Sequence, residues 1–266
     1  MKKTLLLVGA LCVLGTTAFG ATSIGSEVRA IDYKNGTDKT EYTIANGSTD
    51  VAENVKFYFD VDLDTEYNSS NRDKFWDTDW RIQYNVPQEV LGHNLAVSYE
   101  LDYDYNHDVT VEDSTQEKHE VRFAFSKDNY TIAPMVVNNG ITDETYLELD
   151  VYIYNDAPLG MSFDVYSYNY FGRDGHGEFD TDLEMYLYKK VPFHGINLKP
   201  SFGFEGYGLI NEEASENLSV YAQLRIDKTF EIAEGFKATP YVAYTNYNGD
   251  WNETYTEFGI ETSVKF

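Results

Sequence analysis

The chain has too few cysteines to be stabilised by disulfides. Beyond its N-terminal segment, its apolar stretches are too short to form membrane-spanning helices. Its one cysteine, Cys12, lies among 266 residues. Disulfides therefore cannot stabilise the fold, and stability must come from burial or from strand closure. After residue 20 there is no run of about 20 apolar residues, the length that a spanning helix needs. Spanning helices are excluded from that part of the chain.

Basic residues are also scarce. The chain has 20 Lys and Arg against 45 Asp and Glu, a formal charge of −25. This excess of negative charge argues against nucleic acid as a partner and against electrostatic binding to anionic lipid. Chains this acidic are often disordered, but disordered chains lack aromatic residues. Here 16% of the residues are aromatic and 23 are tyrosine, so we expect a folded protein.

The N-terminal segment has the three regions of a secretory signal. Residues 2–3 are lysines, residues 5–14 are apolar, and residues 18–20 read Ala-Phe-Gly, with small residues where signal peptidase requires them. We predict a signal peptide over residues 1–20, cleaved after Gly20. Loss of the two lysines changes the formal charge from −25 to −27. A membrane anchor is the alternative, but this apolar segment is shorter than a spanning helix.

Residues 56–67 alternate between apolar and polar side chains. Because successive residues of a strand point to opposite faces, the pattern predicts a β-strand with one apolar and one wet face. The same alternation covers residues 76–86, 95–106 and 179–188. Runs of about 10 to 14 residues match strands that cross a membrane at a tilt, and they exceed the five or six residues typical of soluble proteins. A soluble β-sandwich, the alternative, does not need such long strands.

The chain ends in the same alternation, through Phe258, Ile260, Thr262, Val264 and Phe266. Here the sequence resembles the bacterial outer-membrane β-barrel class, whose last strand typically ends in an aromatic residue. The resemblance implies an outer-membrane location and recognition by the barrel-insertion machinery through Phe266. Outer-membrane lipid would then contact the apolar faces, which include Phe57, Phe59, Trp80, Ile82, Leu101, Phe123, Leu149, Leu183, Leu224 and Ile260.

Counting back from the C-terminus, the alternating segments pair into antiparallel strands. Twelve are clear, and two shorter segments, 24–33 and 39–46, flank the turn dipeptide Asn35-Gly36. We predict an all-β fold, a closed antiparallel transmembrane β-barrel of 14 strands within residues 21–266. The alternative is 12 strands, with residues 21–52 as a periplasmic arm. An even count places both termini in the periplasm.

Proline marks two kinds of position. Short connections on the predicted periplasmic side contain Pro87, Pro158 and Pro192. Three predicted strands each carry a proline at the same distance from the preceding periplasmic turn. Because proline has no N–H to donate to a neighbouring strand, we expect a bulge there or a position near the rim of the barrel. These repeats are residues 129–134, 195–200 and 235–240. With these strand starts the chain resembles the small monomeric porins of the outer-membrane protein G and oligogalacturonate-channel kind. The resemblance implies a monomer rather than a trimer.

The polar faces are rich in carboxylates, which cannot all be buried against each other because unpaired buried charge is costly. They imply a wet lumen. The predicted pore-lining residues are Asp60, Asp62, Arg81, Glu100, Asp102, Arg122, Glu148, Asp150, Asp164, Asp182 and Glu184. A carboxylate lining favours cations, and Arg81 and Arg122 would shape a constriction opposite it. The alternative is that these residues are solvated without a selected role.

Tyrosines also fall on the inward phase of three consecutive strands, and four of them are candidates for stacking on sugar rings: Tyr166, Tyr168, Tyr186 and Tyr188. Lumen filling and interfacial girdles are the alternatives for this group.

The function indicated is an outer-membrane porin that passes small hydrophilic solutes or cations by passive diffusion, with a preference for cations. The alternative is a plugged barrel whose surface loops bind a partner or serve a structural role. We expect no enzymatic activity, no cofactor and no metal site. The pair His107-Asp108 resembles part of a protease site, but no serine or second carboxylate is placed with it.

Overall fold

A computed structural model describes residues 22–34, 38–68, 71–106, 116–140, 144–172, 179–210, 218–249 and 253–265. The predicted signal peptide, Phe266 and His107-Asp108 lie outside these residues. Within them, no helix has both the length and the apolar character needed to cross a membrane. Apart from a 3₁₀ turn at Pro158–Gly160, the regular structure is β-strand.

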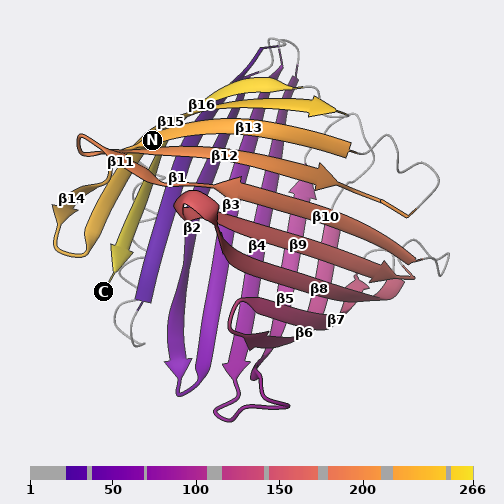
Figure 1. The fold of residues 1–266 in the computed structure, drawn as a ribbon. Helices are drawn as coiled ribbons and strands as arrows, with labels where there is room; N and C mark the ends of the chain where they lie inside the picture. Colours follow the sequence, from indigo (N-terminus) through magenta and orange to yellow (C-terminus); the bar gives the residue numbers. More distant parts are fainter. Residues whose placement is uncertain are drawn as a thin grey trace.

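The strands of the described residues follow one another around the barrel in chain order (Figure 1). They are β1 (Thr22–Tyr33), β2 (Asp38–Ala52), β3 (Val55–Asn68), β4 (Asn71–Asn85), β5 (Asn94–Asn106), β6 (Gln116–Lys127), β7 (Tyr130–Asn139), β8 (Glu144–Ala157), β9 (Met161–Phe171), β10 (Phe179–Tyr188), β11 (Val191–Phe193), β12 (Ile196–Gly206), β13 (Leu218–Asp227), β14 (Phe230–Ala233), β15 (Phe236–Gly249) and β16 (Thr254–Lys265).

Pairing of the first strand with the last closes the sheet. Strands β1 and β16 are antiparallel from Ser23↔Lys265 to Tyr33↔Tyr255, and β10 pairs with β12 on the far side. Strands β11 and β14 are short, and each lies next to the strand that follows it. The remaining strands form a closed antiparallel barrel of 14, as predicted. The 12-strand alternative was wrong, because β1 and β2 are full members of the wall.

Prolines explain why β11 and β14 are separate from the strands before them. Pairing of β10 with β12 stops at Tyr188, opposite the residue that follows Pro200, and β11 resumes it at Val191. The Lys189 nitrogen still donates to the Pro200 oxygen at 3.1 Å, but proline has no N–H to complete the pair. The same break stands beside Pro240, between β13 and β14. Beside Pro134 the β6–β7 register skips from Arg122↔Met135 to Phe125↔Ile132. The expected local irregularity is present at all three prolines.

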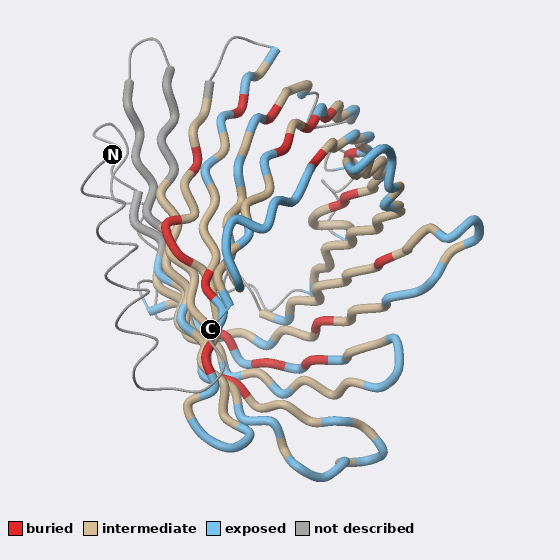
Figure 2. The backbone as a smooth tube through the Cα atoms, turned by 90° about the vertical axis from the view of Figure 1, so that its left-hand side faces the viewer, coloured by how far each residue is buried: buried red, intermediate tan, exposed pale blue. Residues whose placement is uncertain are grey.

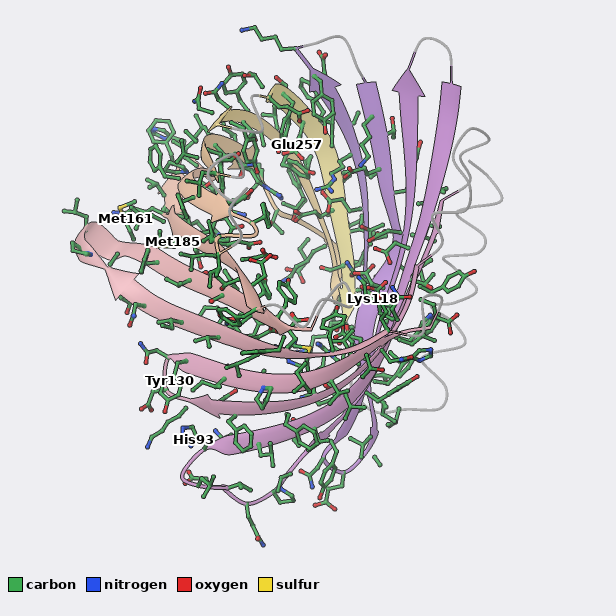
Figure 3. All side chains as sticks on the ribbon, turned by 90° about the vertical axis from the view of Figure 1, so that its right-hand side faces the viewer. His93, Lys118, Tyr130, Met161, Met185 and Glu257 are labelled. Atoms are coloured by element: carbon green, nitrogen blue, oxygen red, sulfur yellow. The ribbon has the colours of Figure 1, made fainter. Side chains whose placement is uncertain are left out.

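The two ends of the barrel differ in their connections. At one end, here called the turn end, short connections join β2 to β3, β6 to β7 and β8 to β9, and Ser23 pairs with Lys265. Left-handed backbone at Asn54 (φ 62°) and Asp128 (φ 48°) makes two of these turns tight. Connections at the opposite end, the loop end, are those that include residues outside the described ranges. Figure 3 marks the turn end by His93, Tyr130 and Met161.

Three prolines were predicted to lie in short connections at one end of the barrel, and two of them do. Pro87 and Pro158 lie in connections at the turn end, whereas Pro192 lies within β11, opposite Asn197.

The barrel is apolar outside and polar inside, the reverse of a soluble protein. Outer side chains are exposed, for example Ile82 at 47% and Phe258 at 57%, whereas the inner Asp150 and Thr245 are 2% and 1% exposed. Figure 2 shows buried residues as short separate stretches along the strands rather than as one central core. All ten residues predicted to face outward are on the outer phase of their strands. Five of them are exposed: Trp80, Ile82, Phe123, Leu224 and Ile260.

Candidate functional site: the polar lumen

Side chains that reach over an intervening strand identify the inner face, because they converge only on the concave side of a closed wall. Arg122 of β6 and Asp150 of β8 approach to 3.2 Å across β7. The register then places every other residue of each strand inside. All eleven predicted pore-lining residues are on this inner phase: Asp60, Asp62, Arg81, Glu100, Asp102, Arg122, Glu148, Asp150, Asp164, Asp182 and Glu184.

One part of the lumen is a wall of facing carboxylates, here called the acidic wall, formed by Asp60, Asp62, Asp77, Asp79 and Asp102 of β3–β5. Asp60 is opposite Asp79, and Asp62 is opposite Asp77. Carboxylate oxygens of Asp77, Asp79 and Asp102 lie within 4.8 Å of one another. Like charges directly opposite each other repel, so this wall is stabilised by any positive charge in the lumen. Asp77 and Asp79 were absent from the predicted set, although the alternation of residues 76–86 places both on the polar face.

Cations border the acidic wall on two sides. Lys118 Nζ lies 3.1 Å from Asp102, and an Arg81 nitrogen lies 3.7 Å from Glu100. Arg81 also covers the ring of Tyr58 at 4.3 Å. A cavity of about 360 Å³ opens here, near the turn end, and its lining includes Ser48, Tyr58, Asp60, Asp79, Arg81 and Glu100. Its walls carry charges of both signs within one space that can admit a small polar solute.

The other described arginines on the inner face each pair with a carboxylate, and two of them also contact a tyrosine. Arg122 contacts Asp150 at 3.2 Å and donates to the Tyr152 hydroxyl at 2.8 Å. Arg225 pairs with Glu261 and lies over the ring of Tyr241 at 3.7 Å.

Arg29, on β1, also lies on the inner face, where it pairs with Glu41 and lies 3.8 Å from Glu257. Arg29 and Arg225 were expected only in the neighbourhood of the predicted ring, and both are on the inner face.

Opposite the acidic wall, carboxylates accept hydrogen bonds from tyrosines. The Tyr186 hydroxyl donates to Glu184 at 2.8 Å and lies 3.2 Å from Glu205. Asp164 accepts from Tyr188 at 3.0 Å. At the loop end of β12 burial raises the pKa of Tyr207, and the Glu205, Glu184 and Asp182 carboxylates add to this effect because they disfavour a second negative charge.

The four predicted sugar-stacking tyrosines are all on the inner face, and they are part of a larger aromatic array. Tyr166 and Tyr186 are in ring contact at 5.7 Å, and Tyr168 lies 6.1 Å from Tyr152. Tyr188 makes its contact through the hydroxyl bond to Asp164. The array continues through Tyr221, Tyr247, Tyr255 and Tyr33 on the inner phase of later strands and of β1, none of which was predicted.

Comparison with known proteins finds similarity only among solved structures: no protein-family model and no curated protein matches the chain. The outer membrane protein Omp33 of Acinetobacter baumannii is 9% identical, with 94% of this chain and 99% of that chain covered and a TM-score of 0.44. A mutant of the Rh. blastica porin is 13% identical over 93% of this chain and 100% of that chain, with a TM-score of 0.37. BamA from Haemophilus ducreyi, lacking POTRA domains 1-3, is 6% identical over 92% and 70%, with a TM-score of 0.43.

Proposed function

We propose that this chain is a bacterial outer-membrane porin that passes small hydrophilic solutes by passive diffusion. One observation carries the proposal: a closed barrel with exposed apolar side chains outside encloses charged, hydrogen-bonded side chains inside. Such a wall satisfies its backbone groups within the sheet, which is what a chain in lipid requires. The polar interior provides a path for solutes that lipid excludes.

The proposed pore prefers cations. The acidic wall and the inner carboxylates Glu100, Glu184 and Glu205 set up a negative potential that concentrates cations and repels anions. The described arginines on the inner face, Arg29, Arg81, Arg122 and Arg225, offset only part of it, because none of them is in a salt bridge to Asp60, Glu184 or Glu205.

The proposed route of export, membrane insertion and orientation of this pore are inferred from the sequence. The N-terminal signal directs export, the barrel-insertion machinery recognises Phe266, and both termini face the periplasm. The proposed unit is a monomer, with no enzymatic step. Protease added to intact cells tests this orientation. We expect it to cleave a tag inserted between residues 107 and 115 and to spare a tag at the C-terminus.

Reversal potentials across a salt gradient in a planar bilayer test the preference. The informative variant is the triple amide Asp60→Asn, Asp102→Asn and Glu184→Gln. We expect a cation preference in the unchanged protein and a severalfold smaller permeability ratio in the variant.

A matched control removes three carboxylates outside the lumen, Glu53→Gln, Glu89→Gln and Glu231→Gln, which lie exposed at the turn end. It loses the same formal charge and is expected to keep the preference. Equal effects of the two triples would refute lumen-based selectivity. Absence of conductance in the unchanged protein would favour the plugged barrel with binding loops.

A further inference from the structure

Seven tyrosines form an unbroken series of ring contacts along the inner face, here called the tyrosine track. Neighbouring ring centroids are 5.1–6.2 Å apart, within the range of favourable aromatic pairs. In order of contact the track is Tyr154 (β8), Tyr166 (β9), Tyr186 (β10), Tyr221 (β13), Tyr247 (β15), Tyr255 (β16) and Tyr33 (β1). Six of these residues come from strands that follow one another between β8 and β16, and the contact of Tyr255 with Tyr33 of β1 is made by barrel closure.

The track runs from one end of the lumen to the other. Tyr154 lies near the turn end of β8, and Tyr166 lies in the middle of β9. Tyr247 and Tyr255 lie at the loop end of β15 and β16, and Tyr33 is the last residue of β1. A row of contacts climbs in this way because the strands of a barrel are tilted and staggered.

Continuity of the track depends on a glycine. Tyr186 and Tyr221 touch at 5.9 Å although β12 lies between their strands. The β12 residue paired with both is Gly203. A Cβ at this position would stand 2.0 Å from Cε1 of Tyr221, so any larger residue must displace that ring.

Carboxylates that form no salt bridge with any described basic residue lie beside the track. Asp164 and Glu205 are 8% and 7% exposed, and their hydrogen bonds come from tyrosine hydroxyls. In the part of the chain that the structure describes, no salt bridge involves Asp164, Glu184 or Glu205. Phenol donors solvate this negative charge but do not neutralise it.

Elsewhere in the same lumen, the protein fills equivalent positions with its own guanidinium groups. Arg225 lies over Tyr241 at 3.7 Å while pairing with Glu261, and Arg122 lies 5.2 Å from the Tyr152 ring while contacting Asp150. Each arrangement combines a cation–π contact with a charge-assisted bond. The track offers the same two elements, half-buried tyrosine rings and carboxylates, without a basic side chain in a salt bridge to Asp164, Glu184 or Glu205.

We propose that the tyrosine track binds organic cations that carry guanidinium or alkylammonium groups and passes them along the lumen. This proposal rests on the channel function proposed above and names its substrate class. The cationic head lies on a tyrosine face beside Asp164, Glu184 or Glu205, and the alkyl portion contacts neighbouring rings. Successive faces let the cation move between similar sites instead of staying in one deep site.

Charge distinguishes this substrate class from neutral sugars. A sugar ring also stacks on tyrosine, but it leaves the buried Asp164 and Glu205 charges uncompensated. A cation gains Coulomb attraction there, and this attraction is strong because the carboxylates are shielded from bulk water.

Calorimetric titration of the full-length purified protein in detergent micelles tests binding without requiring conduction. The probe is agmatine, which has a guanidinium and an ammonium group and no carboxylate; sucrose is the neutral comparison. The inner variant is Tyr166→Leu with Tyr186→Leu and Tyr221→Leu. Its matched control changes three tyrosines exposed on the outer face, Tyr84→Leu, Tyr103→Leu and Tyr244→Leu.

We expect agmatine to bind the unchanged protein and the outer control equally, and to bind the inner variant at least about tenfold more weakly, the loss of about 1.4 kcal/mol. Glu205→Gln should weaken agmatine binding as well, whereas Tyr186→Phe, which keeps the ring face, should largely preserve it. These single variants keep the test decisive if the inner triple does not fold.

Three results overturn the track: agmatine binding that the inner variant and Glu205→Gln leave unchanged, no agmatine binding at all, or sucrose binding that depends on the inner tyrosines while agmatine binding does not. Bilayer recordings separate the two proposals. Agmatine binding by a barrel without conductance refutes the pore and the passage of cations along the track, and leaves only the binding site. Conductance without agmatine binding or block refutes the track alone.

Discussion

Arg122 and Asp150 form an ion pair, 3.2 Å between nitrogen and oxygen, across a strand to which neither belongs. Between them, β7 presents the small Ala133 and the flexible Met135 to the lumen. Asp150 is 2% exposed, and it also accepts a hydrogen bond from Tyr152. The inner side chains therefore connect second neighbours in the wall, in addition to the backbone ladders between adjacent strands.

Removing the guanidinium should destabilise the barrel, because it leaves a buried charge without its counter-ion. We expect Arg122→Gln to lower the free energy of unfolding by about 3 kcal/mol. Adding Asp150→Asn should recover most of this loss, since an amide does not need a cation. Urea unfolding in detergent, followed by tyrosine and tryptophan fluorescence, measures both. A double variant no more stable than the single one would contradict the explanation.

Adjacent residues of β4 should respond oppositely to the same substitution. Ile82 is on the outer face and Gln83 on the inner face. Ile82→Arg should cost about 2–4 kcal/mol if the residue lies near the midplane of the bilayer, because it places a charge in lipid. Gln83→Arg adds the same charge to a wet, acidic lumen and should cost much less. Folding into lipid vesicles, monitored by heat-dependent gel mobility, compares them, and equal costs would mean that the two faces are wrongly assigned.

Filling the space beside Tyr221 should be detectable in spectra. Gly203→Ala puts a methyl group where that ring lies, so we expect a loss of about 1–3 kcal/mol in stability from overpacking and a smaller near-ultraviolet circular dichroism signal from the coupled tyrosines. The control is Ala222→Val, which adds volume on the outer face, opposite Phe202. If both variants keep the full tyrosine signal, Gly203 is not required for the Tyr186–Tyr221 contact.

Salt should weaken the proposed cation preference. The Debye length falls from about 10 Å at 0.1 M to about 3 Å at 1 M salt, so mobile ions screen carboxylates that face water. We expect the permeability ratio to approach one as salt is raised at a constant gradient. The fluorescence of the folded barrel provides the control, since it should not change over this range. A permeability ratio that does not change with salt would mean that pore size, rather than charge, determines selectivity.

Strand positions could be predicted because each strand carries its own evidence. Alternation along residues 56–67 assigns β3 and its two faces without any knowledge of its neighbours. Local evidence was weakest for β1 and β2, where β-bulges between Gly25 and Glu27 and between Thr43 and Ala45 shift the phase of the alternation. Closure settles these strands, since β1 must pair with β16.

The tyrosine track could be predicted only in part. Tyr166 and Tyr186 belong to adjacent hairpin strands, so the alternation already places them together. Their contact with Tyr221 depends on the stagger of the wall and on Gly203, a residue without a side chain. The partners of a lumen residue two strands away depend on register, and the composition of one strand does not contain that information.

Closure also has a consequence for how the barrel forms. Ser26 and Thr262 are 236 residues apart in sequence, and their hydroxyls lie 2.7 Å apart. Most other strand pairs are hairpins whose partners meet across short connections, so they can form early and one after another. The β1–β16 pair closes the longest loop in the chain, and such non-local pairing makes folding slow. Until that step the growing sheet has two unpaired edges, each able to pair with another chain. Assembly thus has a single late event, and the time before it is when the chain is most open to aggregation.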